Sequence, residues 1–234
     1  MAQDNYMFSN KIFNFQFLYN YHIPSGDMAK LYGNFSGVGF GGMLKTKHNW
    51  VVSGELNYLF GKEIRQEHFL DNLITSGGYL SSTGGSPGNY LVNMRGISAF
   101  VNAGKVFGLN KRNMNSGILV KGGVGYIQHH INIQSQEGNI PQIDLNYAPG
   151  YDRFHSGIAF TEFIGYTYQS QNRLINFYIG FDFMQAQTKN RRGYNYDLMA
   201  YDNSNKIDLT SSIRFGWMIP MYLNTSEENE FQFR

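Results

Sequence analysis

Apolar and polar residues alternate along much of the chain, most clearly between Ile207 and Met221. In this stretch the odd positions are mostly apolar, and the even positions are mostly polar or small. Alternation with a period of two indicates a β-strand with one apolar and one polar face. The same pattern recurs along the whole chain, so we predict an all-β fold.

The pattern predicts eight strands separated by polar connections. Their approximate ranges are 13–21, 35–45, 50–60, 90–107, 118–133, 157–168, 174–185 and 207–221. The first, third, fifth and seventh connections are generally longer than the second, fourth and sixth. Transmembrane barrels show this asymmetry, with short periplasmic turns and longer extracellular loops. We therefore predict an antiparallel up-and-down transmembrane β-barrel of about eight strands. It would form a single domain over residues 1–234, with strands between about 11 and 222 and a polar tail at 223–234.

Aromatic residues gather on one face of several predicted strands. Five of them share a face between residues 13 and 21, which is hard to fit inside a small core. We expect these faces to point into lipid, with tyrosine toward the interface. The residues that we predict to face lipid are Phe13, Phe15, Phe17, Tyr19, Phe177, Phe181, Phe215 and Trp217.

Composition narrows the class of protein. The net charge is +2, so there is no electrostatic case for nucleic acid as a partner. The absence of cysteine excludes disulfides, thiolate metal sites and a cysteine nucleophile. Aromatic residues make up 16% of the chain, yet the mean hydropathy is −0.37. No apolar run approaches the roughly 20 residues that a membrane helix requires. This combination fits a transmembrane β-barrel, and it also fits an aromatic-rich soluble β-protein, so composition alone does not decide between them.

The expected location is the outer membrane of a Gram-negative cell, in contact with outer-membrane lipid and lipopolysaccharide. The start of the chain, MAQDNYMF, lacks a basic segment followed by an apolar one. Ala2 followed by Gln3 resembles the trace of a cleavage site. We therefore expect a mature form from which the signal peptide has been removed.

A barrel of about eight strands encloses only enough space for its own side chains. We therefore expect a packed polar interior rather than an open pore. The charged residues that we place there are Glu55, Arg95, Lys121, Glu162, Asp182, Asp208 and Arg214. Four acids and three bases nearly cancel, which permits the pairing that buried charges require. We interpret the set as a structural salt-bridge network, with a gated proton or ion path as the alternative.

Arg95 and Glu162 fit the alternation least well. Arg95 falls in register with apolar Ile97 and Val101, so an inward position requires a β-bulge near Gly96. The two faces of the strand that carries Glu162 do not separate cleanly.

Histidines near the extracellular rim are the first candidates for catalysis. They are His68, His129, His130 and His155. Ser/His/Asp sets can be assembled on paper because serine and aspartate are common in the loops, but no nucleophile elbow or other local signature supports one. We predict no catalytic residue, and a rim-located enzyme acting on lipid or peptide is the alternative.

Metal and nucleotide sites are poorly supported. His129 and His130 are adjacent in a strand and point to opposite faces, so they do not easily share an ion with His155. The glycines at 37, 39 and 42 have GxGxxG-type spacing, but they lie inside a strand with no helix after it. We predict no metal and no cofactor.

Arg191 and Arg192 lie in the seventh connection. Their positive charges would suit lipopolysaccharide phosphates at the outer leaflet, but we favour a solvated loop for them.

Three segments carry a resemblance to a known group. They are PSGDMAKLYGNFSGVGFGGMLKTKHNW (24–50), GYDRFHSGIAFTEFIGY (150–166) and NRLINFYIGFDFMQAQTKNRR (172–192). In architecture the chain resembles the small eight-stranded OmpA/OmpX-like outer-membrane barrels, and these segments resemble a barrel group of the Bacteroidota. The resemblance implies that the chain comes from a bacterium that uses type IX secretion and gliding. The chain departs from the pattern of a simple barrel because it does not end on an aromatic strand residue. Its last strand aromatic is Tyr222, and a polar tail follows.

Our first hypothesis is a non-enzymatic outer-membrane barrel, a scaffold or accessory subunit of a larger envelope complex for secretion or assembly. It rests on a self-filled lumen, the lack of a coherent catalytic set, and large loops suited to contacts with a protein partner. The alternatives are the rim-located enzyme and a narrow channel.

Overall fold

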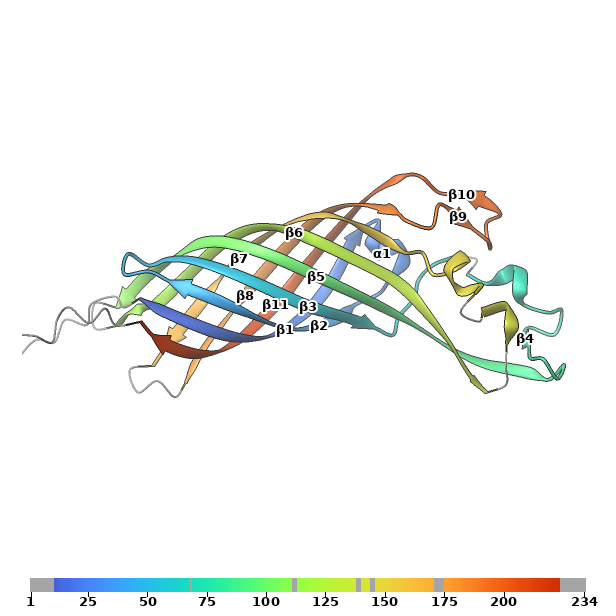
Figure 1. The fold of residues 1–234 in the computed structure, drawn as a ribbon, viewed down its shortest axis with the longest axis horizontal. Coiled ribbons are helices and arrows are strands. Elements are labelled where there is room, and N and C mark those ends of the chain that lie inside the picture. The colour runs from blue at the N-terminus through green and yellow to red at the C-terminus, as the bar shows by residue number, and fades with distance from the viewer. Residues whose placement is uncertain are drawn as a thin grey trace, which may run out of the picture.

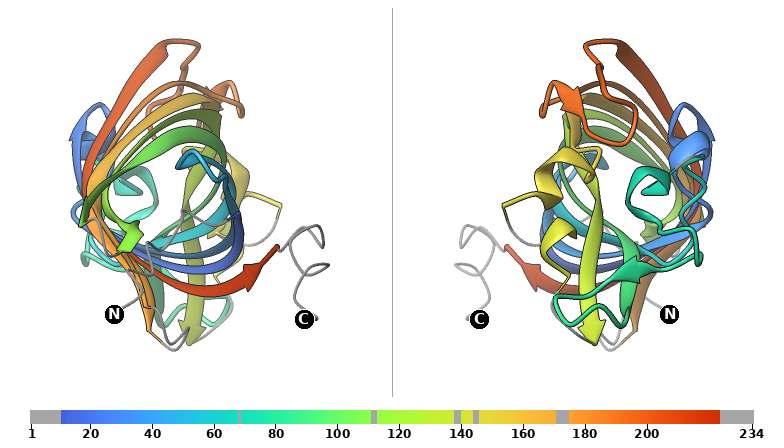
Figure 2. Two further views of the ribbon diagram at one scale, coloured as in Figure 1. Left: turned by 90° about the vertical axis from the view of Figure 1, so that its left-hand side faces the viewer. Right: turned by 90° about the vertical axis from the view of Figure 1, so that its right-hand side faces the viewer.

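The computed structural model describes residues 11–67, 69–110, 113–137, 140–143, 146–170 and 175–223. Within these ranges eight long strands form a closed antiparallel barrel, which confirms the predicted fold (Figures 1 and 2). They are β1 (Ile12–Gly26), β2 (Phe35–Lys45), β3 (Trp50–Gly61), β5 (Pro87–Asn110), β6 (Asn113–Glu137), β7 (His155–Gln169), β8 (Asn176–Asn190) and β11 (Asn205–Tyr222).

Each long strand pairs with the next long strand in the chain, and the first strand pairs with the last. The closing pair runs from Ile12 opposite Tyr222 to Gly26 opposite Asp208. Because each of the eight long strands has a neighbour on both sides, the barrel wall that they form has no open edge among the described residues, as a lipid environment demands.

The long connections all lie at the end of the barrel opposite the termini (Figure 1). Short elements occupy them: α1 (Met28–Leu31), β4 (Leu80–Ser81), β9 (Tyr194–Asn195), β10 (Ala200–Tyr201), and the 3-10 helices η1 (Asp71–Leu73), η2 (Pro141–Ile143) and η3 (Ala148–Gly150). By the usual arrangement of such barrels, this end is extracellular. No helix among the described residues is long and apolar enough to cross a membrane.

The aromatic faces point outward. All eight aromatic residues predicted to face lipid lie on the outer side of their strands, where burial alternates with every second residue. Phe17 is 52% exposed, and its ring stacks on Trp217 of the neighbouring strand with 5.7 Å between centroids. The polar neighbours Asn14, Gln16 and Asn20 point inward and are buried. A closed barrel with this exterior is built for hydrocarbon, so the chain is a transmembrane barrel.

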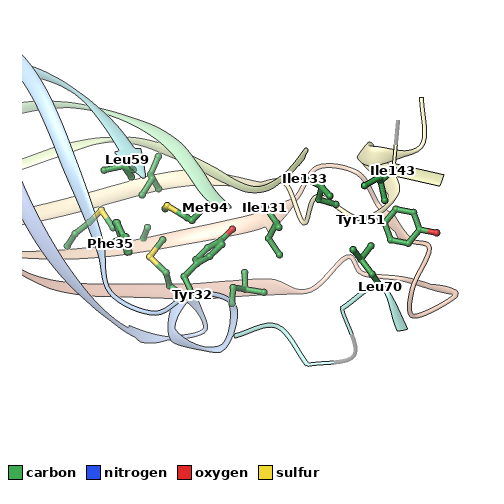
Figure 3. Close-up of a cluster of buried hydrophobic side chains, with 14 of the residues drawn as sticks. Tyr32, Phe35, Leu59, Leu70, Met94, Ile131, Ile133, Ile143 and Tyr151 are labelled. Atoms are coloured by element: carbon green, nitrogen blue, oxygen red, sulfur yellow. The ribbon is translucent and has the colours of Figure 1, made fainter. Parts of the chain in front are cut away.

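The interior has three layers rather than the uniformly polar filling predicted from the sequence. An apolar cluster at the end of the short turns includes Met43, Val51 and Val106. Charged residues follow. A larger apolar cluster then extends from Phe35 and Leu59 in the barrel into the extracellular loops (Figure 3).

The larger apolar cluster lies at the level where the strands leave the membrane. Near the top of β6, Ile127 and Ile131 point inward while Gln128 and His130 lie on the outer face. The polarity of the two faces is therefore inverted relative to the lipid-exposed part of the same strand. Water surrounds the strand at this level, so its apolar side chains are stable only inside.

Candidate functional site

The barrel interior holds a ring of four charges centred on Glu55. One carboxylate oxygen of Glu55 accepts a hydrogen bond from the Lys121 ammonium, and the other lies 2.7 Å from Nη1 of Arg214. Nη2 of Arg214 lies 3.2 Å from Oδ2 of Asp182. All four side chains are buried. Two acids and two bases therefore neutralise each other in the lumen.

Polar neighbours complete the bonding of these charges. Ser53 donates to Glu55 across 3.2 Å, and Thr161 donates to Asp182 across 2.9 Å. The Nε of Arg214 donates to the side-chain oxygen of Asn20, 2.8 Å away. The Lys121 ammonium also lies 5.2 Å from the ring centroid of Tyr178. Such complete pairing is what makes buried charges tolerable, so the network ties several strands together across the lumen.

A second polar cluster lies between the charge ring and the extracellular loops. Oδ2 of Asp208 is 3.1 Å from Nε2 of His129 and accepts a hydrogen bond of 2.5 Å from the Thr188 hydroxyl. Nδ1 of His129 is 3.0 Å from the Tyr32 hydroxyl. Because a carboxylate only accepts, Nε2 of His129 donates to Asp208. The three residues form a relay in the order Tyr32, His129, Asp208.

This relay has the order of a catalytic triad but lacks a usable nucleophile. Tyr32 lies between α1 and β2 and is completely buried. Burial raises the pKa of the Tyr32 phenol well above its ordinary value, so the hydroxyl stays neutral. A substrate would have no access to it. The arrangement holds the first loop over the barrel mouth.

The other candidate histidines are placed apart. His155 stacks on His129 inside the barrel, with 5.5 Å between ring centroids, whereas His130 lies on the outer face. His68 lies outside the described residues. Among the residues that the structure describes, no three His, Asp or Glu side chains are grouped to hold a metal ion. The glycines at 37, 39 and 42 lie within β2, and β3 follows it after a short turn.

The structure corrects the predictions for Arg95 and Glu162. Arg95 lies on the outer face, because the pairing of β5 with β3 and β6 runs through Gly96 without the required bulge. Its guanidinium donates to the carbonyl of Met94, 3.1 Å away, at a level where the exterior is polar. Glu162 is also on the outer face and is exposed. It lies within the apolar band, by which we mean the part of the barrel exterior whose outward side chains are mostly apolar. The interior set is therefore Glu55, Lys121, Asp182, Asp208 and Arg214.

Arg191 and Arg192 bond within the protein. Arg192 forms an ion pair with Asp152, with 2.6 Å between Nη2 and Oδ2, and its guanidinium lies 5.1 Å from the ring centroid of Phe154. The hydrogen bond with Asp152 raises the pKa of Arg192 further above its ordinary value. The Nε of Arg191 donates to the Ser156 hydroxyl across 2.8 Å. Both arginines fasten the seventh connection to the start of β7.

Several buried polar residues were missed by the sequence analysis. Tyr32 and Arg153 lie in connections, where the alternation that identifies inward positions is absent. Thr188 lies on β8 above the predicted end of that strand. Extending the alternation of this strand by a few residues would have placed Thr188 on the same inward face as Asp182.

No protein-family model and no curated protein sequence matches this chain. Solved structures with a similar arrangement of strands include Ail, the attachment invasion locus protein of Yersinia pestis, at 10% identity and a TM-score of 0.45, covering 89% of this chain and 99% of Ail. Neisserial surface protein A has 10% identity and a TM-score of 0.40, covering 88% and 96%. The outer membrane protein AlkL, studied in lipid bilayers, has 12% identity and a TM-score of 0.38, covering 97% of each chain. Likeness at this level does not extend to activity, ligand or partner. The barrel's own exterior and closure place it in an outer membrane.

Proposed function

We propose that the chain is a non-enzymatic outer-membrane barrel that acts as a scaffold or accessory subunit of a larger envelope complex. The observation that carries this proposal is the position of Glu162 on the outside of the barrel. A carboxylate in a lipid-facing band marks a surface that meets something other than lipid, because ionisable groups are costly against hydrocarbon.

Glu162 is surrounded by apolar side chains. Along β7 its outer-face neighbours are Phe160, which is 60% exposed, and Ile164. Across the strands it lies opposite Gly122 of β6 and Phe183 of β8. Its direct neighbours along and across the strands are thus apolar residues or glycine, and the first polar side chain on the outer face of β8 is Gln185, opposite Phe160.

Gly122 leaves room beside this carboxylate. A Cβ atom added at Gly122 would meet only the carbonyl oxygen of Thr161, at 3.7 Å. A side chain from a neighbouring membrane segment can therefore reach the barrel backbone next to Glu162. A cationic or hydrogen-bond-donating residue on that segment would remove the cost of exposing the carboxylate to lipid.

The filled lumen supports a role through surfaces rather than transport. The charge ring and the two apolar clusters occupy the interior among the described residues, and the relay at Tyr32 is closed to substrates. The segments that resemble the Bacteroidota barrel group favour a complex of protein secretion, by association with type IX secretion. Contacts with surrounding lipid and lipopolysaccharide would be made by the rest of the apolar band.

The test is purification of the tagged protein from native membranes in mild detergent. Wild-type protein is expected to bring down a stoichiometric membrane partner, and Glu162→Gln is expected to lose most of it. Glu162→Leu is expected to lose the partner as well, while making the isolated barrel more stable, because it removes an unpaired carboxylate from the lipid face.

The matched control is Val101→Gln, which places an amide on an equally exposed lipid-facing position of β5. It should retain the partner. Recovery of the wild-type barrel always alone would argue against a subunit role. Loss of the partner in the Val101→Gln protein as well would show that any polar change on the exterior disturbs the complex.

A further inference from the structure

An extracellular pocket of about 630 Å³ opens between the first, third, fifth and seventh connections. Its wall includes Lys30 of α1, Asn195 of β9 and the exposed Leu198 of the seventh connection. Its volume lies within the range of ligand pockets, and most of its lining residues are polar or charged. The lining therefore suits a small polar ligand rather than an apolar one.

Two buried side chains in the pocket wall each have an unused bonding position. Arg153 is 3% exposed and donates through Nη2 to Oδ2 of Asp197, 2.6 Å away, whereas its Nη1 has no hydrogen-bond partner. His155 is 1% exposed, and its Nε2 has no partner. Buried polar atoms in proteins are almost always bonded, so each of these two atoms has a bonding position that a ligand group or an ordered water can fill.

The backbone at Arg153 is strained to hold this position. Its φ is +48°, in the left-handed region that is unfavourable for a residue with a side chain. Strain of this kind persists where the surroundings enforce it, and it clusters at ligand sites. Here the carbonyl of Arg153 bonds the ring of His155, so one turn of chain orients both side chains.

The two unused positions have opposite character. Nδ1 of His155 lies 2.7 Å from the Arg153 carbonyl oxygen, which only accepts, so Nδ1 carries the proton. Burial favours the neutral form of the His155 ring, because the partner of Nδ1 is a carbonyl and not a carboxylate. The Nε2 of the neutral ring is an acceptor. Nη1 of Arg153 is a donor. A hydroxyl group satisfies both, because it accepts from one atom and donates to the other, whereas a fully ionised phosphate or carboxylate has no proton for Nε2.

The charges at the rim do not favour an anion. Lys30 is paired with Asp27 at 2.8 Å, and Lys206 lies 3.7 Å from Asp202. The hydrogen bond from Lys30 lowers the pKa of Asp27, which keeps that pair ionised. The guanidinium of Arg153 already faces Asp197. The pocket thus offers many hydrogen-bonding groups with little net attraction for negative charge.

We propose that this pocket binds a saccharide through its hydroxyl groups, with Arg153 donating to a hydroxyl and His155 accepting from one. The sugar comes either from the oligosaccharide of a lipopolysaccharide in the same membrane or from a soluble glycan outside the cell. The proposal is independent of the partner at Glu162, because it concerns a different end of the barrel.

The experiment uses the purified full chain in lipid nanodiscs with nitrogen-15-labelled histidine. Three probes are titrated separately: a neutral glucose trisaccharide, deacylated lipopolysaccharide, and inorganic phosphate. The expected result is a saccharide-dependent change at one histidine Nε2 resonance, and preference between the first two probes identifies the source. A response to phosphate alone, or no histidine response at millimolar saccharide, would overturn the proposal.

Two variants assign the response. His155→Asn keeps a donor near the Arg153 carbonyl but removes the Nε2 acceptor, and it should weaken saccharide binding about tenfold or more. Arg153→Lys should weaken it similarly. The control is Arg95→Gln, on the outer face of β5 and outside this pocket, which should leave affinity unchanged. Unchanged affinity in folded His155→Asn protein would refute the site. If neither variant folds, the wild-type titration decides.

Discussion

Glu55 and Arg214 meet across the lumen, with 2.7 Å between Oε2 and Nη1, although their strands β3 and β11 are separated in the barrel by β2 and β1. The pair is 5% and 2% exposed. It therefore acts as a brace through the interior, in addition to the backbone ladder around the wall. Asp182 and Lys121 complete the ring from β8 and β6.

Removing one member of this ring should be costly. Glu55→Gln leaves two buried cations facing the single carboxylate of Asp182, and the free energy of unfolding should fall by about 3–5 kcal/mol. The double variant Glu55→Gln, Lys121→Met restores one acid and one base and should recover much of the loss. Urea unfolding in lipid vesicles, followed by tryptophan fluorescence, measures both.

The control for that series is Glu63→Gln. Glu63 pairs with Arg65 at 2.7 Å, but both side chains are about half exposed, so its loss should cost less than about 1 kcal/mol. Equal stabilities of the Glu55→Gln and wild-type proteins would show that the ring contributes no net stability.

The filled lumen predicts an electrically silent barrel. Ions would have to pass the apolar cluster at Val51 and Val106, the neutralised charge ring, and the larger cluster around Ile127. Neither apolar layer offers ligands that replace an ion's hydration shell. Purified protein in planar bilayers should therefore show no discrete conductance steps. Reproducible single-channel currents would restore the narrow channel that was an alternative at the sequence level.

The two tryptophans of the chain report whether the exterior is embedded in lipid. Trp50 is 56% exposed and Trp217 is 48% exposed, both on the outer face. Trp50 begins β3 next to a short turn, and the Lys105 ammonium lies 5.2 Å from its ring centroid, as befits an interfacial position. Trp217 is five residues from the end of β11 at Tyr222, stacks on Phe17 and lies opposite Phe177, among the aromatic side chains of the outer face.

Lipids brominated at different depths test this assignment through single-tryptophan variants. Trp217 should be quenched most by bromines deep in the acyl chains, and Trp50 most by bromines near the headgroups. Efficient quenching of both residues by aqueous acrylamide instead would mean that this surface faces water.

The alternation of apolar and polar residues was enough to predict the closed antiparallel barrel, the exterior aromatics and most of the interior charges. It failed where its assumption of lipid outside and polar inside no longer held. Arg95 lies above the lipid, where a charged outer face is normal, so polarity gave the wrong side. Glu162 lies within the lipid band, and its charge again suggested an inward position. The proposed protein partner would account for its outward position. The pocket at Arg153 was beyond sequence reasoning because loops that are distant in the chain build it.

Alanine substitutions at two glycines, one on each face of the barrel wall, test which face points inward. Gly180 of β8 points inward opposite Gly165, and an added Cβ would lie 2.3 Å from the carbonyl oxygen of Ile164 and 2.8 Å from the ring of Phe163. Gly54 of β3 points outward, and an added Cβ would meet nothing within 4 Å. Gly180→Ala should therefore lower the free energy of unfolding by about 1–3 kcal/mol, because backbone and ring must shift. Gly54→Ala should be neutral or stabilising by up to about 1 kcal/mol, because it restricts only the unfolded chain. Urea unfolding in vesicles distinguishes the two, and a reversed order would mean that the inner and outer faces of the barrel have been exchanged.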